Sequence, residues 1–168
     1  MMMGWHAKKG QNAVFPVPEA QRPIIPVKMC GECGCQTVMM MVDSGNDVSL
    51  LNRQDAGRIC LRHGDRMIKV AGISQNPMGF TMFGHVPIQI GMTDPVTIPV
   101  AVGDVRDNLL GREQIRHDFD FTLTRDSVIL RRHDDVPVAN IDRYHTSQGY
   151  RLRDTHSHTH GSYQGGYV

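Results

Sequence analysis

The chain has 168 residues, of which 18 are Lys or Arg and 17 are Asp or Glu. This length suits one ordinary domain with terminal extensions. Because the charges nearly cancel, we expect no electrostatic attraction to nucleic acid or to an anionic membrane surface.

Residues 1–26 contain four prolines and little periodicity, so they are interpreted as an extended leader whose last few residues could pair as an edge strand. The chain start lacks the continuous apolar segment of a signal peptide. Its longest apolar run, residues 38–42, is far shorter than the roughly 20 residues that span a bilayer. We therefore expect a cytoplasmic protein with no membrane segment.

We predict that residues 27–132 form an all-β domain, because they contain short alternating or apolar runs that are separated by Gly, Pro, Asn and Asp. In chain order, we predict strands at 27–29 and 36–42, a helix or turn at 52–57, a hairpin of 67–73 and 79–91, a strand at 96–102, a strand, turn and short helix within 107–117, and a closing hairpin of 119–123 and 127–131. Residues 133–168 are rich in His, Gly and Tyr and poor in aliphatic residues, so they are expected to be a disordered tail.

The segment VMMMVDSGNDVSLL, residues 38–51, places a carboxylate where an apolar strand ends. Asp43, Ser44 and Gly45 are all common turn residues, so the tripeptide alone indicates little. Its context is more informative. A strand of buried type leads into it, Asp47 follows four residues after Asp43, and an apolar run resumes at Val48.

This combination resembles the signature of the retropepsins, the aspartic proteases of retroviruses and retrotransposons. A second element, NLLGREQI at residues 108–115, is similar to the family's Asn-apolar-apolar-Gly-Arg segment. The order of the predicted elements over residues 27–131 also agrees with the family. The resemblance implies an all-β fold: a closed β-barrel equivalent to half of an acid protease, with one short helix and a dimeric active site.

The implied activity is hydrolysis of extended peptide or polyprotein segments by an aspartic endopeptidase. In this chemistry, a water lies between two carboxylates that share one proton, because two such close like charges cannot both ionise. The chain contains one Asp-[Ser/Thr]-Gly, and at Asp126 the glycine position holds Val128. The second carboxylate must then come from another copy, so we expect a homodimer. No metal, organic cofactor, nucleic acid or membrane partner is implied.

The resemblance assigns catalysis to Asp43, with Ser44 hydrogen-bonding across the two-fold axis and Gly45 allowing close approach of the two loops. It also implies an ion pair between Asp47 and Arg112 that braces the catalytic loop against the start of the helix. Two unrelated surface charges remain the alternative for that pair.

The remaining assignments concern support of the loop and contact with substrate. Asn108 and Gly111 are expected to support the site together with Arg112. Residues 71–78 are the candidate flap, which would close over a peptide by main-chain hydrogen bonds. Substrate contacts are expected from Asn46, Asp47, Gly72, Ile73, Ser74, Met78, Val105 and Leu109, with Phe80 nearby. Ordinary core packing is the alternative for the apolar members.

Other interpretations stay open. Cys30, Cys33 and Cys35 could form a zinc site with Cys60 or a histidine, but we expect reduced thiols, oxidisable between Cys30 and Cys35. The alternating histidines of residues 156–160 could chelate a metal or be a solvated tail. Finally, the same fold could be a catalytically silent binding or dimerisation module, although the intact Asp-Ser-Gly favours an enzyme.

Overall fold

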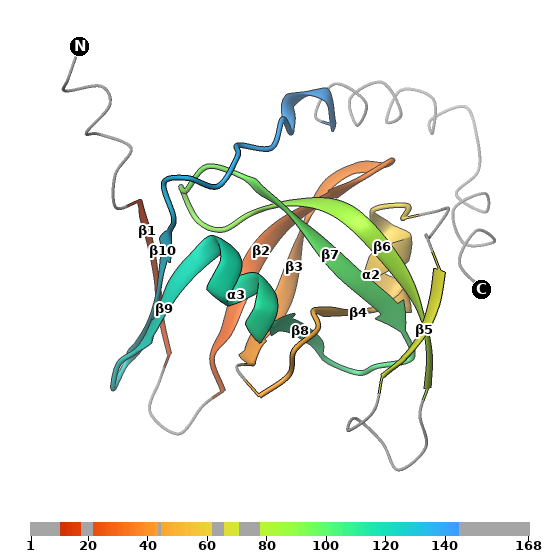
Figure 1. Cartoon of the computed structure of the whole chain (residues 1–168), viewed down its shortest axis with the longest axis horizontal. Coiled ribbons are helices and arrows are strands. Elements are labelled where there is room, and N and C mark those ends of the chain that lie inside the picture. Colours follow the sequence, from red (N-terminus) through yellow and green to blue (C-terminus); the bar gives the residue numbers. More distant parts are fainter. Residues whose placement is uncertain (1–10, 18–21, 44, 62–65, 71–77, 145–168) are drawn as a thin grey trace.

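The structure is a computed structural model that describes residues 11–17, 22–43, 45–61, 66–70 and 78–144. Its centre is a closed β-barrel of six strands (Figure 1). Their order around the barrel is β2 (Ile24–Gly31), β3 (Gly34–Asp43), β8 (Asn108–Gly111), β4 (Leu50–Asn52), β7 (Val96–Gly103) and β6 (Met78–Gln89). Pairing of β6 with β2 closes the barrel, and β5 (Arg66–Val70) pairs only with β6 among the described strands. The predicted all-β barrel is therefore confirmed at the level of fold class.

The predicted elements occur in the predicted order, and the structure adds two strands that were not predicted, β1 and β4. The strands are β1 (Asn12–Pro16), β2 (Ile24–Gly31), β3 (Gly34–Asp43), β4 (Leu50–Asn52), β5 (Arg66–Val70), β6 (Met78–Gln89), β7 (Val96–Gly103), β8 (Asn108–Gly111), β9 (Phe119–Leu123) and β10 (Ser127–Arg132). Between the described strands lie the helices α2 (Arg53–Arg58) and α3 (Arg112–Asp118). The prediction of one short helix is thus wrong, since the segment left open as helix or turn forms α2.

The alternating pattern of β2 and β3 explains their place in the barrel wall. Ile25, Val27 and Met29 of β2 are fully buried, whereas Ile24 is 47% exposed. In β3, Val38, Met40 and Val42 face the core, while Met39 points outward. Because side chains of a strand alternate between its faces, the inward sets of the two strands meet inside the barrel with those of β6 and β7.

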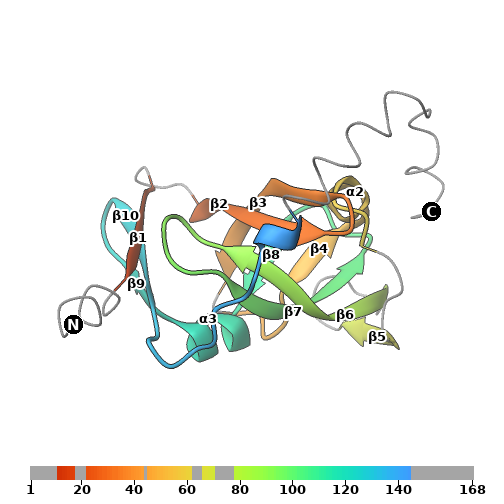
Figure 2. The same cartoon turned by 90° about the horizontal axis from the view of Figure 1, so that it is seen from above.

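A three-stranded sheet in the order β1-β10-β9 packs beside the barrel (Figure 2). β1 lies within residues 1–26, where we expected an extended leader, and it pairs with β10 from Asn12↔Arg131 to Pro16↔Ser127. Ala13 and Val17 are buried in the main core. The prolines did not prevent this pairing because Pro16 ends an edge strand, where a missing N–H is tolerated.

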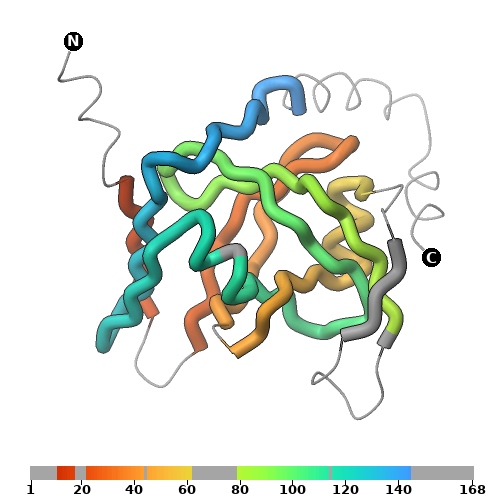
Figure 3. The backbone as a smooth tube through the Cα atoms, viewed as in Figure 1, coloured from red at the N-terminus to blue at the C-terminus, as the bar shows by residue number. Residues whose placement is uncertain are grey.

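Residues 133–144, which we expected to belong to a disordered tail, have a defined place in the structure. The segment 133–144 runs from β10 across the barrel toward the turn between β2 and β3 (Figure 3). Arg132 is 5% exposed and anchors this segment, because its guanidinium donates to the carbonyl oxygens of Val136 and Pro137 at 2.8 and 3.0 Å. Further along, Ile141 is buried against Cys30 and Cys35.

All four cysteines form disulfides, Cys30–Cys35 across the β2–β3 hairpin and Cys33–Cys60 from its turn to the residues after α2. The expectation of reduced thiols is therefore wrong for this structure, although the Cys30–Cys35 pairing was foreseen as the oxidised alternative. Cys60 could not be paired from sequence, since only the fold brings it to the hairpin turn.

No helix in the described part of the chain is long and apolar enough to cross a membrane.

Candidate active site

Asp43 is the last residue of β3, and it lies beside Gly111, the last residue of β8, in a parallel pairing. Its side chain is on the same face of β3 as Met39 and Met41, because alternate residues of a strand share a face. Asp43 is half-buried. The strand thus ends on a carboxylate at the edge of the barrel wall, which is where the sequence analysis predicted it.

A tight turn follows Asp43 and orients its carboxylate. The backbone N–H of Gly45 donates to Asp43 Oδ1 at 2.9 Å, and the N–H of Asn46 donates to the Asp43 carbonyl oxygen at 3.4 Å. A Cβ at Gly45 would lie 3.2 Å from Asp43 Oδ1, so glycine leaves room for this contact. Within the described residues the carboxylate has no other hydrogen-bond partner, which leaves Oδ2 open to a water or a second acid. Ser44 lies outside the described residues.

The loop after this turn is anchored to the start of α3. The N–H of Arg112 donates to the Asn46 carbonyl oxygen at 2.6 Å, and the N–H of Glu113 donates to the Asp47 carbonyl oxygen at 3.3 Å. The Arg112 guanidinium also binds Asp47 Oδ1. The predicted Asp47–Arg112 ion pair is present, with side chains that are 61% and 47% exposed.

Gly111 lets β8 approach this loop very closely. A Cβ at Gly111 would lie 2.5 Å from the backbone carbon of Val48 and 2.8 Å from the nitrogen of Ser49. The Gly111 N–H donates to the buried Ser49 Oγ at 2.9 Å. Ser49 is therefore a supporting residue that the sequence analysis missed, because nothing in its local sequence indicates that it faces β8.

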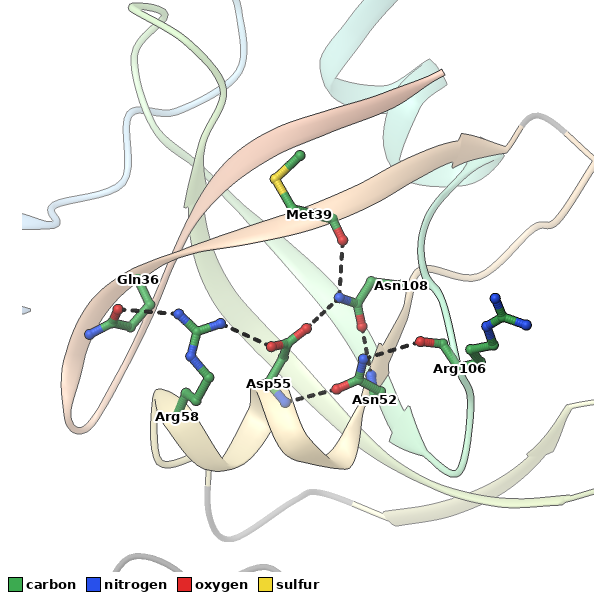
Figure 4. A network of polar contacts seen from close by, with 7 residues as sticks. All are labelled: Gln36, Met39, Asn52, Asp55, Arg58, Arg106 and Asn108. Atoms are coloured by element: carbon green, nitrogen blue, oxygen red, sulfur yellow. Dashed lines mark hydrogen bonds and ion pairs between the residues drawn. The ribbon is translucent and has the colours of Figure 1, made fainter. Parts of the chain in front are cut away.

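Asn108 of β8 joins β3 to α2 through a partly buried polar network (Figure 4). Its Nδ2 donates to the Met39 carbonyl oxygen at 3.0 Å and to Asp55 Oδ2 at 2.6 Å. Its Oδ1 accepts from the Asn52 N–H at 2.8 Å, and the Asn52 side chain caps α2 by accepting from the N–H of Asp55. Arg58 satisfies Asp55 Oδ1 at 3.0 Å. The predicted supporting role of Asn108 thus involves α2, whose contribution had not been predicted.

Most of the predicted flap, residues 71–77 of 71–78, lies outside the described residues, but the strands on either side of it, β5 and β6, are paired, with Val70 opposite Met78. Figure 1 shows this end of the hairpin and the end of β3 on the same lower side of the molecule. Gly72, Ile73 and Ser74 lie outside the described residues, as does the side chain of Met78. The backbone of Met78 begins β6.

Val105 and Leu109 pack, partly exposed, on a small apolar cluster of Leu50, Phe80 and Ala101 that is separate from the main core. Phe80 has no exposed surface, so it is an ordinary core residue and does not line a substrate pocket. Val105 and Leu109 keep surface that a ligand could reach. Asn46, a predicted substrate contact, has a buried Nδ2 without a hydrogen-bond partner in the described structure.

With both disulfides closed, the described residues contain no group of three or more His, Cys, Asp or Glu side chains that could hold a metal ion. The histidines of residues 156–160 lie outside the described residues. No protein-family model matches the chain, and no curated protein matches it either.

Proposed function

We propose that this protein is an aspartic endopeptidase of retropepsin type that acts as a homodimer on extended peptide or polyprotein segments. The observation that carries the proposal is the half-buried Asp43 carboxylate at the end of β3. A tight turn holds one of its oxygens, and the other has no hydrogen-bond partner among the described residues. A carboxylate that is fixed in this way suits the positioning of a water for attack on a peptide carbonyl.

The mechanism needs two copies of Asp43. One ionised carboxylate would remove a proton from the bound water, while the protonated carboxyl group of the other copy would donate to the carbonyl oxygen. The water oxygen would bond to the carbonyl carbon, and collapse of the tetrahedral intermediate would break the C–N bond as the amine is protonated. A two-fold axis beside Asp43 would supply both groups from one motif.

One further feature supports a site that is incomplete in one subunit. The buried Asn46 Nδ2 lacks an acceptor among the described residues, and a buried donor without a partner is costly in a finished structure. A peptide carbonyl or a partner subunit could supply that acceptor. The Arg112 contacts with Asn46 and Asp47 would keep the loop in position for either.

The direct test is Asp43→Asn in the full chain, measured as cleavage of a mixed peptide library. Asparagine keeps the shape of the side chain but cannot share the proton, so we expect cleavage to be lost while the fold and the dimer remain. Asp126→Asn is the matched control, because Asp126 also precedes a serine but lies in the exposed turn between β9 and β10. Cleavage by Asp43→Asn would contradict the proposal.

A folded wild-type dimer that cuts no peptide would instead favour the silent binding module. A cytoplasmic location is a separate part of the proposal, and the two disulfides of the structure give a test of it, because cytoplasmic conditions would reduce them. Protein isolated from its native compartment with both disulfides closed would contradict the cytoplasmic location.

A further inference from the structure

A pocket of about 630 Å³ lies beside the outward face of β3. Its floor is apolar and comes from Ile24, Met39 and Met41, of which Ile24 and Met39 are 47% and 52% exposed. Met41 and Asp43 share one face of β3, and they are two residues, or about 7 Å, apart along the strand. The pocket floor is therefore continuous with the surface that carries the candidate catalytic carboxylate.

The polar wall of this pocket is fixed by the network of Figure 4. Both carboxylate oxygens of Asp55 are already used, one by Asn108 and one by Arg58. Asn52 donates to the carbonyl oxygen of Arg106 at 3.4 Å, which ties the loop before β8 to the start of α2. These groups shape the pocket, but they leave little unmet hydrogen-bonding capacity in it.

The charge that remains is positive. Arg22 and Asp107 form an exposed pair on the rim, with nitrogen and oxygen 3.8 Å apart. Arg106 is exposed, and its guanidinium has no acidic partner among the described residues. Figure 4 shows its side chain directed away from Asp55. A ligand group entering the pocket would thus meet an apolar floor and, on the exposed rim, one guanidinium without an acidic partner among the described residues.

We propose that this pocket selects an acidic side chain of the peptide substrate, with Arg106 as the specificity-determining residue. The inference rests on the proposed function. A glutamate fits the arrangement because its methylene groups can cover the methionine floor while its carboxylate binds the guanidinium by charge-assisted hydrogen bonds. The spacing along β3 places that residue within a few positions of the scissile bond, since an extended peptide has the same rise per residue as a strand.

The test uses pairs of peptides that differ only by Glu or Gln, with the exchange made in turn at each position flanking the scissile bond. Glu and Gln have the same shape, so the ratio of their kcat/KM values reports the charge alone. For wild type we expect a preference for Glu of about fivefold at one position, as for an exposed ion pair, and a smaller preference at high salt.

Arg106→Gln should bring this ratio close to one, and Arg106→Glu should invert it. Arg125→Gln, which removes the same charge from the turn between β9 and β10, should leave the ratio unchanged. Cleavage that depends on Asp43 but uses Glu and Gln equally at every position would overturn the pocket assignment and leave the proposed function intact. An absence of Asp43-dependent cleavage would overturn the proposed function itself, and the specificity pocket with it.

Discussion

The two ends of the β2–β3 hairpin are held in different ways. At the Gly31–Gly34 end, two disulfides fix the hairpin to itself and to the residues after α2, and Ile141 covers one of them. At the other end, Asp43 enters a loop that is held by backbone hydrogen bonds, one exposed ion pair and the close approach of Gly111. We call these the disulfide end and the site end.

The difference indicates how stability and the proposed catalysis would be divided in this molecule. Covalent links raise stability chiefly by restricting the unfolded chain, wherever they are placed. Contacts at the site end are individually weak, but they set the position of one carboxylate, and catalysis is sensitive to small misplacements. Changes at the disulfide end should therefore alter stability more than cleavage, and changes at the site end should do the reverse.

The largest expected effect on stability is removal of the long-range disulfide. Cys33→Ser with Cys60→Ser opens a link between residues 27 positions apart and should lower the free energy of unfolding by roughly 3 to 4 kcal/mol. Urea unfolding without reductant measures this. The control pair Cys30→Ser and Cys35→Ser opens a link over 5 positions and should cost roughly 2 kcal/mol. Loss of peptide cleavage in a still-folded variant would contradict the division between the two ends.

Gly111→Ala should affect both stability and cleavage. The added Cβ would lie 2.5 Å from backbone atoms that cannot rotate away, so the loop after Asp43 must shift. We expect a loss of roughly 2 kcal/mol in unfolding free energy, together with a large loss of cleavage. Gly57→Ala in α2 is the control, because alanine favours helix there and should stabilise slightly. Normal cleavage by Gly111→Ala would show that the loop tolerates displacement.

Arg112→Ala should separate the two properties most clearly. Its ion pair with Asp47 is exposed and should contribute at most about 1 kcal/mol to folding. Loss of the bracing contact should nevertheless reduce kcat/KM several-fold. Arg53→Ala removes a comparably exposed pair with Asp104, away from the loop, and should leave cleavage unchanged. Equal cleavage by both variants would contradict a role of the Asp47–Arg112 ion pair in catalysis.

The smallest effect concerns His133, where the segment leading to the disulfide end begins. Its hydrogen bond with Asp120 raises the pKa of His133 above the ordinary value, against a smaller opposing effect of burial. The stabilisation should be complete below the unfolded-state pKa and be lost as pH rises through the higher folded-state pKa. Unfolding midpoints of wild type and His133→Gln should thus differ in acid and converge at higher pH. A difference independent of pH would contradict this assignment.

The sequence was most informative where one face of a strand is buried. The alternating apolar residues of β3, and the polar turn residues around β9 and β10, predicted those strands correctly. They did so because burial of one face of a strand places an apolar residue at every second position. The same local pattern identified Asp43 and its turn. Asn108 and Arg112 were found only through the family resemblance. The structure pairs Arg112 with Asp47, as the resemblance implied, and it pairs Asn108 with the carbonyl oxygen of Met39, which the resemblance did not specify.

The features that the sequence analysis missed depend on contacts between distant segments. β1 is short and ends on a proline, so its pairing with β10 was not evident locally. Cys60, Ser49 and Asp55 acquire their roles only when α2 and β8 come together beside β3. The pocket around Arg106 is of the same kind, because it draws on four separate stretches of the chain.

The central claim is that two copies of Asp43 form one site. Its most direct test is a mixed dimer of one wild-type and one Asp43→Asn subunit, purified through two different affinity tags and assayed on the peptide that wild type cuts best. If the two carboxylates share one proton, the mixed dimer should lose nearly all activity. If it keeps about half of the wild-type activity, each subunit works alone and the shared site is refuted.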